Sequence, residues 1–221
     1  MTSEERVPFI RKELDSLYPE THTFLHYEKD YELLFATILS AQATDRSVNA
    51  CTRVLFAEYP SLESFANAKE EDLLPLLRPV GLGKSKAHYL VSCAKVLLEK
   101  YNGQLPNDRE TLVTLPGVGV KTSGVVLGEL YDAPYLPVDT HVFRVSHRLG
   151  LVPDRVKTPE ESEKRLEKLF PGEKSLIHRH RQLILLGRNY CMARNPHCST
   201  CPLAPYCKYN QQNQKKTAKK D

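Results

Sequence analysis

Apolar residues recur along this chain every three or four positions, which is the spacing of one face of an α-helix. The pattern is clearest over residues 86–103, where a stripe of apolar side chains is followed by Gly103. The stripe consists of Leu90, Val91, Ala94, Leu97 and Leu98. A glycine directly after such a stripe is typical of a helix end, so this segment is predicted to be a helix.

The same spacing predicts helices along most of the chain. A second clear case covers residues 158–170, which open with Thr158 and carry a proline in the first turn. Further helices are predicted near residues 3–16, 29–41, 45–58, 107–114, 120–131, 140–149 and 174–189. No segment shows the convincing apolar–polar alternation of a half-buried strand. The sequence therefore predicts an all-α protein.

The length and the apolar content narrow the class of protein. The chain has 221 residues, enough for one large domain or two small ones with a buried core. Its first residues are charged, and no apolar run approaches the ~20 residues that cross a membrane. We therefore expect a cytoplasmic protein without a membrane partner. An ATP-binding loop at Gly83-Lys84-Ser85 is excluded, because the glycine required five residues before Gly83 is replaced by Arg78.

The net charge of +4 is concentrated at the end of the chain. Residues 208–221 contain five lysines and one aspartate, which equals the charge of the whole protein. The rest of the chain is close to neutral, so binding to nucleic acid would require a local basic surface. Because the segment has no large apolar residue after Tyr209, residues 208–221 are predicted to be a basic, disordered tail.

Four of the six cysteines lie close together near the C-terminus. Cys191, Cys198, Cys201 and Cys207 follow the spacing C-x6-C-x2-C-x5-C. In a reducing compartment this clustering favours metal binding over disulfides. Zinc and a [4Fe–4S] cluster both accept four thiolates, and the presence of a single C-x2-C pair favours the cluster. The other two, Cys51 and Cys93, fall in apolar helical patterns and are predicted to be core residues.

A tight turn stands between two predicted helices in "LPGVGVKT", residues 115–122. Gly117 and Gly119 permit backbone conformations that other residues avoid, and they leave room for close approach. The backbone N–H groups before a helix can bind a phosphate without reading sequence. The glycines by themselves favour an ordinary connection between helices over DNA binding.

Two residues near this turn carry candidate chemistry. Lys121 begins the helix after the glycines, where a lysine is either a phosphate contact or, with its pKa depressed, a nucleophile. Asp139 stands directly before a helical stripe formed by Val142, Val145 and Leu149. It is therefore predicted to be the N-cap of that helix, with or without a second role.

Four segments together resemble the endonuclease III family of DNA glycosylases, and the resemblance extends over nearly the whole chain up to Cys207. The segments are "LSAQATDRSVN" (39–49), "LPGVGVKT" (115–122), "VDTHVFRVSHRLGL" (138–151) and the four-cysteine loop. The resemblance implies two helical lobes flanking a DNA-binding cleft. Residues 24–135 would form a six-helix barrel with the helix-hairpin-helix motif. Residues 1–23 and 136–207 would form an iron–sulfur cluster lobe.

The resemblance also implies an activity and a set of site residues. The family removes oxidised pyrimidines from double-stranded DNA and cleaves abasic sites by β-elimination. Lys121 would be the nucleophile that forms a Schiff base, and Asp139 would stabilise charge on the sugar. The four clustered cysteines would hold a [4Fe–4S] cluster, with Arg188 and Arg194 offsetting its negative charge. The implied DNA contacts are Gln42 and Leu82 as wedges, the hairpin residues Gly117, Val118 and Gly119, and His141 and Arg144 at phosphates. For His141 and Arg144 the packing or solvation of their helix is an equal alternative. We further expect a monomer associated with the nucleoid.

Two other functions remain open from the sequence. A mismatch glycosylase of the same superfamily would keep Asp139 and the cluster, but it would lack the lysine nucleophile. A non-catalytic DNA-binding module would use the hairpin and hold a structural zinc. The sequence also departs from the endonuclease III pattern at Val120, where the family commonly has an arginine.

Overall fold

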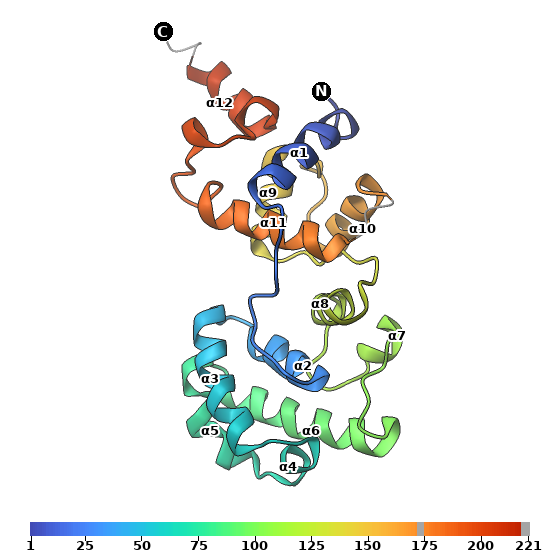
Figure 1. Cartoon of the computed structure of the whole chain (residues 1–221). Helices are drawn as coiled ribbons and strands as arrows, with labels where there is room; N and C mark the ends of the chain where they lie inside the picture. Colours follow the sequence, from blue (N-terminus) through green and yellow to red (C-terminus); the bar gives the residue numbers. More distant parts are fainter. Residues whose placement is uncertain (172–174, 218–221) are drawn as a thin grey trace. The chain divides into compact units, whose positions relative to one another are not determined.

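The computed structural model describes residues 1–171 and 175–217, and these residues contain helices and no strand (Figure 1). The all-α prediction is confirmed. Contacts between Cα atoms divide the chain into two compact units. We call Thr23–Tyr131 the continuous unit, and Met1–His22 together with Asp132–Asp221 the discontinuous unit. None of the described helices combines the length and the hydropathy needed to span a membrane.

The continuous unit is built around one helix that is hydrophobic on all sides. Its helices are α2 (Asp30–Leu39), α3 (Asp45–Glu58), α4 (Leu62–Asn67), α5 (Glu70–Leu77), the short η1 (Arg78–Val80), α6 (Gly83–Tyr101), α7 (Arg109–Leu112) and α8 (Val120–Tyr131). In α2 every residue from Tyr31 to Leu39 is buried, and the helix contacts α3, α6 and α8. A helix that is apolar all round is a core helix, because no face of it can be left in water.

Several helix boundaries in this unit differ from the sequence expectation. The helix predicted over 86–103 begins earlier, at Gly83, and it ends at Tyr101 before the left-handed residues Asn102 and Gly103. The helices α4 and α5 were not predicted, and the helix predicted near 107–114 is reduced to the four residues of α7. α4 and α7 are too short to display a helical period, and α5 contains Pro75.

The discontinuous unit joins the first helix of the chain to the last ones. It contains α1 (Ser3–Leu17), α9 (Thr140–Leu149), α10 (Pro159–Leu169), α11 (Leu176–Asn189), the short η2 (Cys198–Thr200) and η3 (Ala204–Tyr206), and α12 (Lys208–Thr217). The buried side chain of Gln182 on α11 donates to the backbone oxygens of Leu14 and Tyr18 at 3.2 and 2.8 Å. Arg179, also buried, donates to Asp15 at 2.9 Å. These bonds fasten the C-terminal end of α1 to α11.

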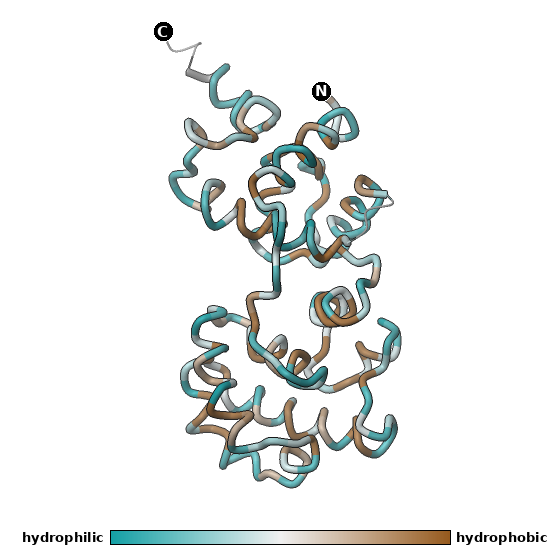
Figure 2. The backbone as a smooth tube through the Cα atoms, in the orientation of Figure 1, coloured by the Kyte–Doolittle hydropathy of each residue, from teal (hydrophilic) through white to brown (hydrophobic). Residues whose placement is uncertain are grey.

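The beginning of the predicted disordered tail is helical. α12 covers Lys208–Thr217, although its sequence is almost wholly hydrophilic, as its teal colour shows beside the largely brown α8 (Figure 2). The helix is anchored near its start, because Lys208 forms an ion pair with Asp154 at 2.7 Å and the ring of Tyr209 lies under Arg148. These polar contacts hold α12 in place, because its sequence has no apolar face that could pack against the rest of the unit. Residues 218–221, and position 174 of the helix predicted over 174–189, lie outside the described residues.

Candidate active site and cluster pocket

The glycine turn before α8 has a conformation that requires glycine at one position. Gly117 has φ +79°, and a Cβ atom there would lie 2.7 Å from Cγ of Tyr89. Val118 anchors the turn, because its side chain is buried and its N–H donates to the oxygen of Leu115 at 3.1 Å. That N–H is engaged within the turn, and the DNA contact expected of Val118 stays a prediction. At Gly119 a Cβ would meet nothing within 4 Å, so this glycine is open to a close neighbour.

Lys121 is the second residue of α8 and its side chain is exposed. The oxygen of Gly119 accepts the N–H of Ser123 at 2.9 Å, so the helix begins immediately after the glycine turn. The first N–H groups of a helix have no partner within it and give this end a partial positive charge. Val120 is 40% exposed, and it occupies the position at which the pattern described above commonly has an arginine. The structure therefore presents one side-chain amine and a row of backbone donors at the same helix end.

Asp139 is the N-cap of α9, as predicted. Its Oδ1 accepts the N–H of Val142 at 2.7 Å, and its backbone is extended. The stripe behind it is confirmed, since Val142, Val145 and Leu149 are all buried. Asp139 is half-buried, so part of the carboxylate stays accessible while the cap bond is made. Asp139 belongs to the discontinuous unit, whereas Lys121 belongs to the continuous unit.

The two expected wedge residues share an unusual backbone. Gln42 has φ +55° and Leu82 has φ +53°, and both residues are exposed, Leu82 by 54%. A residue other than glycine in this region costs about 1–3 kcal/mol and persists only where its surroundings impose it. The structure joins the two loops through Lys86, a buried residue that the sequence did not single out.

Arg144 and His141 make packing contacts within the discontinuous unit, and a phosphate contact for either residue stays a prediction. The Arg144 guanidinium donates to the oxygens of Cys191 and Gly187 at 3.0 and 3.1 Å, and it lies 3.1 Å from Nδ1 of His141. A Cβ on Gly187 would come within 3.2 Å of both side chains, so this glycine permits the close approach of α9 and α11. Arg144 therefore clamps α9 to the end of α11.

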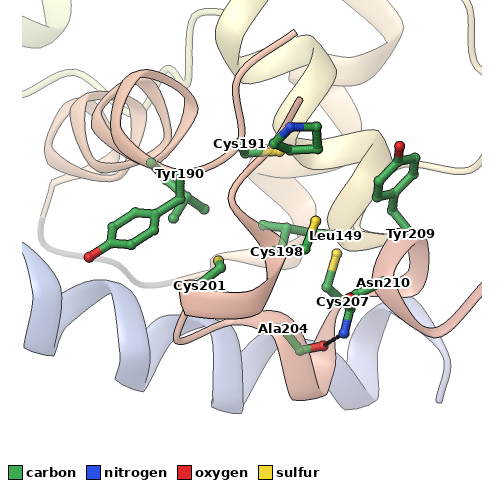
Figure 3. A pocket seen from close by; sticks show the side chains of 11 residues that line it. Leu149, Tyr190, Cys191, Cys198, Cys201, Ala204, Cys207, Tyr209 and Asn210 are labelled. Atoms are coloured by element: carbon green, nitrogen blue, oxygen red, sulfur yellow. Dashed lines mark hydrogen bonds between the residues drawn. The ribbon is translucent and has the colours of Figure 1, made fainter. Parts of the chain in front are cut away.

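The four clustered cysteines line a single pocket in the discontinuous unit (Figure 3). Its other walls include Leu149, Leu186, Tyr190, Pro196, Ala204, Tyr209 and Asn210. Among the described residues no group of three His, Cys, Asp or Glu side chains is placed to hold one metal ion. The four cysteines line one cavity. Four thiolates around a single cavity suit a cluster in which each iron takes one cysteine.

Burial affects the protonation of these thiols. It raises the pKa of the Cys201 thiol to about 11, and it also raises the pKa of the Cys207 thiol. Both groups are therefore protonated at neutral pH in the absence of metal, and ligation must release their protons. Cys51 and Cys93, by contrast, are confirmed as buried core residues of the continuous unit.

Arg148 places a positive charge beside the sulfur of one of the clustered cysteines. Its NH1 lies 3.5 Å from Sγ of Cys191 and 2.7 Å from the oxygen of Met192. The sequence had pointed to Arg188 and Arg194 for this role, and both of those side chains are exposed. Arg148 lies on α9, 43 positions before Cys191, and the packing of α9 against α11 and α12 brings it beside that cysteine.

The helical hairpin and the cysteine pocket define a class of protein. Residues 35–172 match the family model of the HhH-GPD superfamily base excision DNA repair proteins. Residues 191–207 match the iron–sulfur binding domain of endonuclease III. The chain belongs to the endonuclease III family. It is 45% identical over 191 residues to endonuclease III of Rickettsia felis, covering 86% of this chain and 88% of the relative.

Solved structures agree with this assignment. A non-covalent endonuclease III–DNA complex and a trapped endonuclease III–DNA covalent intermediate each superpose with a TM-score of 0.90. Both are 36% identical in sequence and cover 97% of this chain and 100% of their own. The iron–sulfur match, together with the pocket, identifies the cofactor as a [4Fe–4S] cluster.

Proposed function

We propose that this protein is a bifunctional DNA glycosylase and abasic-site lyase of base excision repair, acting on oxidised pyrimidines in double-stranded DNA. The observation that carries the proposal is the exposed Lys121 at the start of α8, directly after the glycine turn. The relatives named endonuclease III and the trapped covalent intermediate of one of them support it.

In the proposed reaction Lys121 is the nucleophile. A damaged base is flipped out of the duplex, at least cost where it pairs or stacks poorly. The neutral Nζ of Lys121 then bonds to C1′ of the sugar, and the base leaves with the electron pair of the glycosidic bond and takes up a proton. Opening of the sugar ring gives a Schiff base. Loss of a C2′ proton breaks the bond between C3′ and its oxygen, which cleaves the strand, and water finally releases the lysine.

Asp139 has two tasks in this proposal. One Oδ atom caps α9 and fixes the carboxylate, and the carboxylate stabilises positive charge developing on the sugar and exchanges protons with the amine. The N–H groups at the start of α8 and the turn at Gly119 bind the phosphate backbone. Val118 holds the turn and lies with Gly117 and Gly119 at the proposed DNA contact.

The remaining assignments concern the organisation of the protein. We assign the discontinuous unit as the cluster lobe and the continuous unit as the barrel lobe, supported by the division of contacts after His22 and after Tyr131. Cys191, Cys198, Cys201 and Cys207 are the proposed ligands, and a cluster bound to them joins three short segments of chain by iron–sulfur bonds. The protein acts as a cytoplasmic, nucleoid-associated monomer. Neither a lysine-independent mismatch glycosylase nor a zinc-containing binding module is favoured by a comparable observation.

Borohydride trapping tests the proposal. Purified protein carrying its cluster is mixed with a duplex containing one thymine glycol, with an abasic duplex and with an undamaged duplex, and the imine is reduced. We expect a covalent adduct with the first two duplexes alone. Lys121→Gln should form no adduct and should still bind the lesion. An adduct that persists in Lys121→Gln contradicts the assignment of the nucleophile, and the absence of any adduct from the unsubstituted protein contradicts the function.

A further inference from the structure

One buried lysine lies beneath both wedge loops of the continuous unit and has no part in the proposed reaction. Lys86, on the first turn of α6, is only 2% exposed. Its Nζ donates to the oxygen of Ala41 at 2.8 Å and to the oxygen of Val80 at 2.7 Å. Its backbone N–H donates to the oxygen of Leu82 at 3.0 Å. A single residue therefore contacts both loops.

The positions of these acceptors matter because of peptide geometry. The oxygen of Ala41 lies in the same rigid peptide plane as the nitrogen of Gln42, so holding the oxygen restricts the φ angle of Gln42. In the same way, the bond from Lys86 to the oxygen of Val80 holds the peptide plane between Val80 and Gly81. Gly81 directly precedes Leu82. Gln42, Gly81 and Leu82 all have positive φ. The two bonds thus act on the segments whose conformation is least favourable without external support.

The charge on Lys86 calls for an explanation beyond packing. Burial lowers the pKa of this amine, which shows that its charged form is disfavoured by its surroundings. A methionine of similar length would fill the same space without that penalty. What methionine cannot supply is a pair of N–H donors for two oxygens from segments 39 residues apart in the chain, residues 41 and 80.

We propose that Lys86 is a positioning residue for base flipping, holding Gln42 and Leu82 at a fixed spacing before DNA is bound. The inference rests on the proposed function, in which these two exposed side chains enter the gap left by the flipped base. A wedge already in place spends none of the binding energy on ordering two loops. Lys86 would not touch DNA and would act only through the wedge residues.

A double-mutant cycle tests this inference. Lys86→Met is made in the natural chain and in a chain carrying Gln42→Ala and Leu82→Ala, and single-turnover base release from thymine glycol duplex is measured with cluster-loaded protein. Lys95→Met is the matched control, since Lys95 is an exposed lysine on the same helix. We expect Lys86→Met to slow release by about tenfold or more in the natural chain, because small misplacements are costly. In the wedge-deleted chain the same change should have less than about a twofold effect.

Each other outcome contradicts the inference. An equal loss in both backgrounds means that Lys86 acts elsewhere, and no loss in the natural chain means that it does not position the wedges. If Lys86→Met does not fold, Lys86→Gln carries the test, because its shorter amide keeps the site polar and can serve one oxygen at a time. If the natural chain is inactive on the lesion, the proposed function is wrong and this inference fails with it. If the natural chain is active, but Lys86→Met slows base release equally with and without the wedge residues, only the inference is wrong.

Discussion

At the scale of single residues, Asp139 combines a structural bond with a proposed chemical role. The cap bond from Val142 to Oδ1 requires only an oxygen acceptor, which asparagine also provides. The stabilisation of positive charge requires the carboxylate. The two roles are therefore separable by substitution at this one position.

We expect Asp139→Asn to leave the free energy of unfolding within about 0.5 kcal/mol of the natural value, because asparagine is an equally good N-cap. Base release should fall by about a hundredfold, as on loss of one preorganised charge partner. Thermal unfolding and single-turnover kinetics measure the two effects. Asp139→Ala is the companion variant, and it should lose about 1 kcal/mol as well as activity. Unchanged base release in Asp139→Asn would leave Asp139 with the capping role alone.

Arg144 and Arg148 lie one helical turn apart on α9, and both depend on the multiple donors of a guanidinium group. Both guanidinium groups bind backbone oxygens of the segment 187–193. The motif suggested DNA contacts for Arg144, and two of its backbone acceptors lie more than forty positions away along the chain. A pattern of neighbouring residues carries no information about such partners.

At the scale of elements, the hairpin before α8 depends on the packing of one ring. The turn passes so close to Tyr89 of α6 that only a glycine fits at position 117, and its positive φ adds a second reason. Gly119, two residues further on, has neither constraint. Substitution of Gly119 therefore serves as the control for substitution of Gly117.

We expect Gly117→Ala to lower the free energy of unfolding by about 2 kcal/mol, through the strained φ and the collision with Tyr89. Gly119→Ala should change it by less than about 0.5 kcal/mol. Chemical denaturation followed by circular dichroism gives both values, and fluorescence anisotropy with an abasic duplex should show weaker binding for Gly117→Ala. Equal stability of the two variants would mean that the turn relaxes without cost.

How well the sequence predicts a helix depends on the length of the helix and on how far along the chain its contacts lie. Three helices, 45–58, 120–131 and 140–149, were predicted with the bounds that the structure has, because their apolar stripes are long and their ends are marked by glycine or a cap. α4 and α7 are shorter than two helical turns, so no period is visible. α12 has no apolar stripe and depends on partners such as Asp154.

The same distinction applies to the candidate site. Lys121, Asp139 and the cysteines could be proposed from the sequence because their signals are local: a turn, a cap and a spacing. Lys86 was not found, since nothing in the sequence distinguishes it from the exposed Lys84 two residues earlier. Its importance comes from an oxygen 45 positions away.

At the scale of the whole molecule, the cluster is expected to hold together a segment that has little core of its own. Between Cys191 and Cys207 the structure has only two short 3-10 helices, and the buried side chains there are Leu203 and Cys207. A segment with so few apolar contacts has little stability independent of its ligand.

Removal of the cluster should therefore loosen one part of the protein selectively. Protein as purified should contain about four irons per chain. After oxidative removal, hydrogen–deuterium exchange should rise through residues 191–217, while α2 and α6 keep their protection because they belong to the other unit. The single substitution Cys201→Ser should have the same effect. Unchanged exchange in the 191–217 segment would show that the fold of this region does not depend on the metal.

The discontinuous unit also determines the order in which the protein can be completed during its synthesis. Gln182 binds oxygens of Leu14 and Tyr18, which are 168 and 164 positions earlier in the chain. At translation rates of about 5–20 residues per second, α1 waits roughly 10–30 seconds for this partner. A helix of 15 residues is marginal alone in water, whereas the continuous unit emerges whole during that interval. The nascent chain therefore completes the unit that bears Lys121 first, and α1, although synthesised before that unit, is among the last helices to pack.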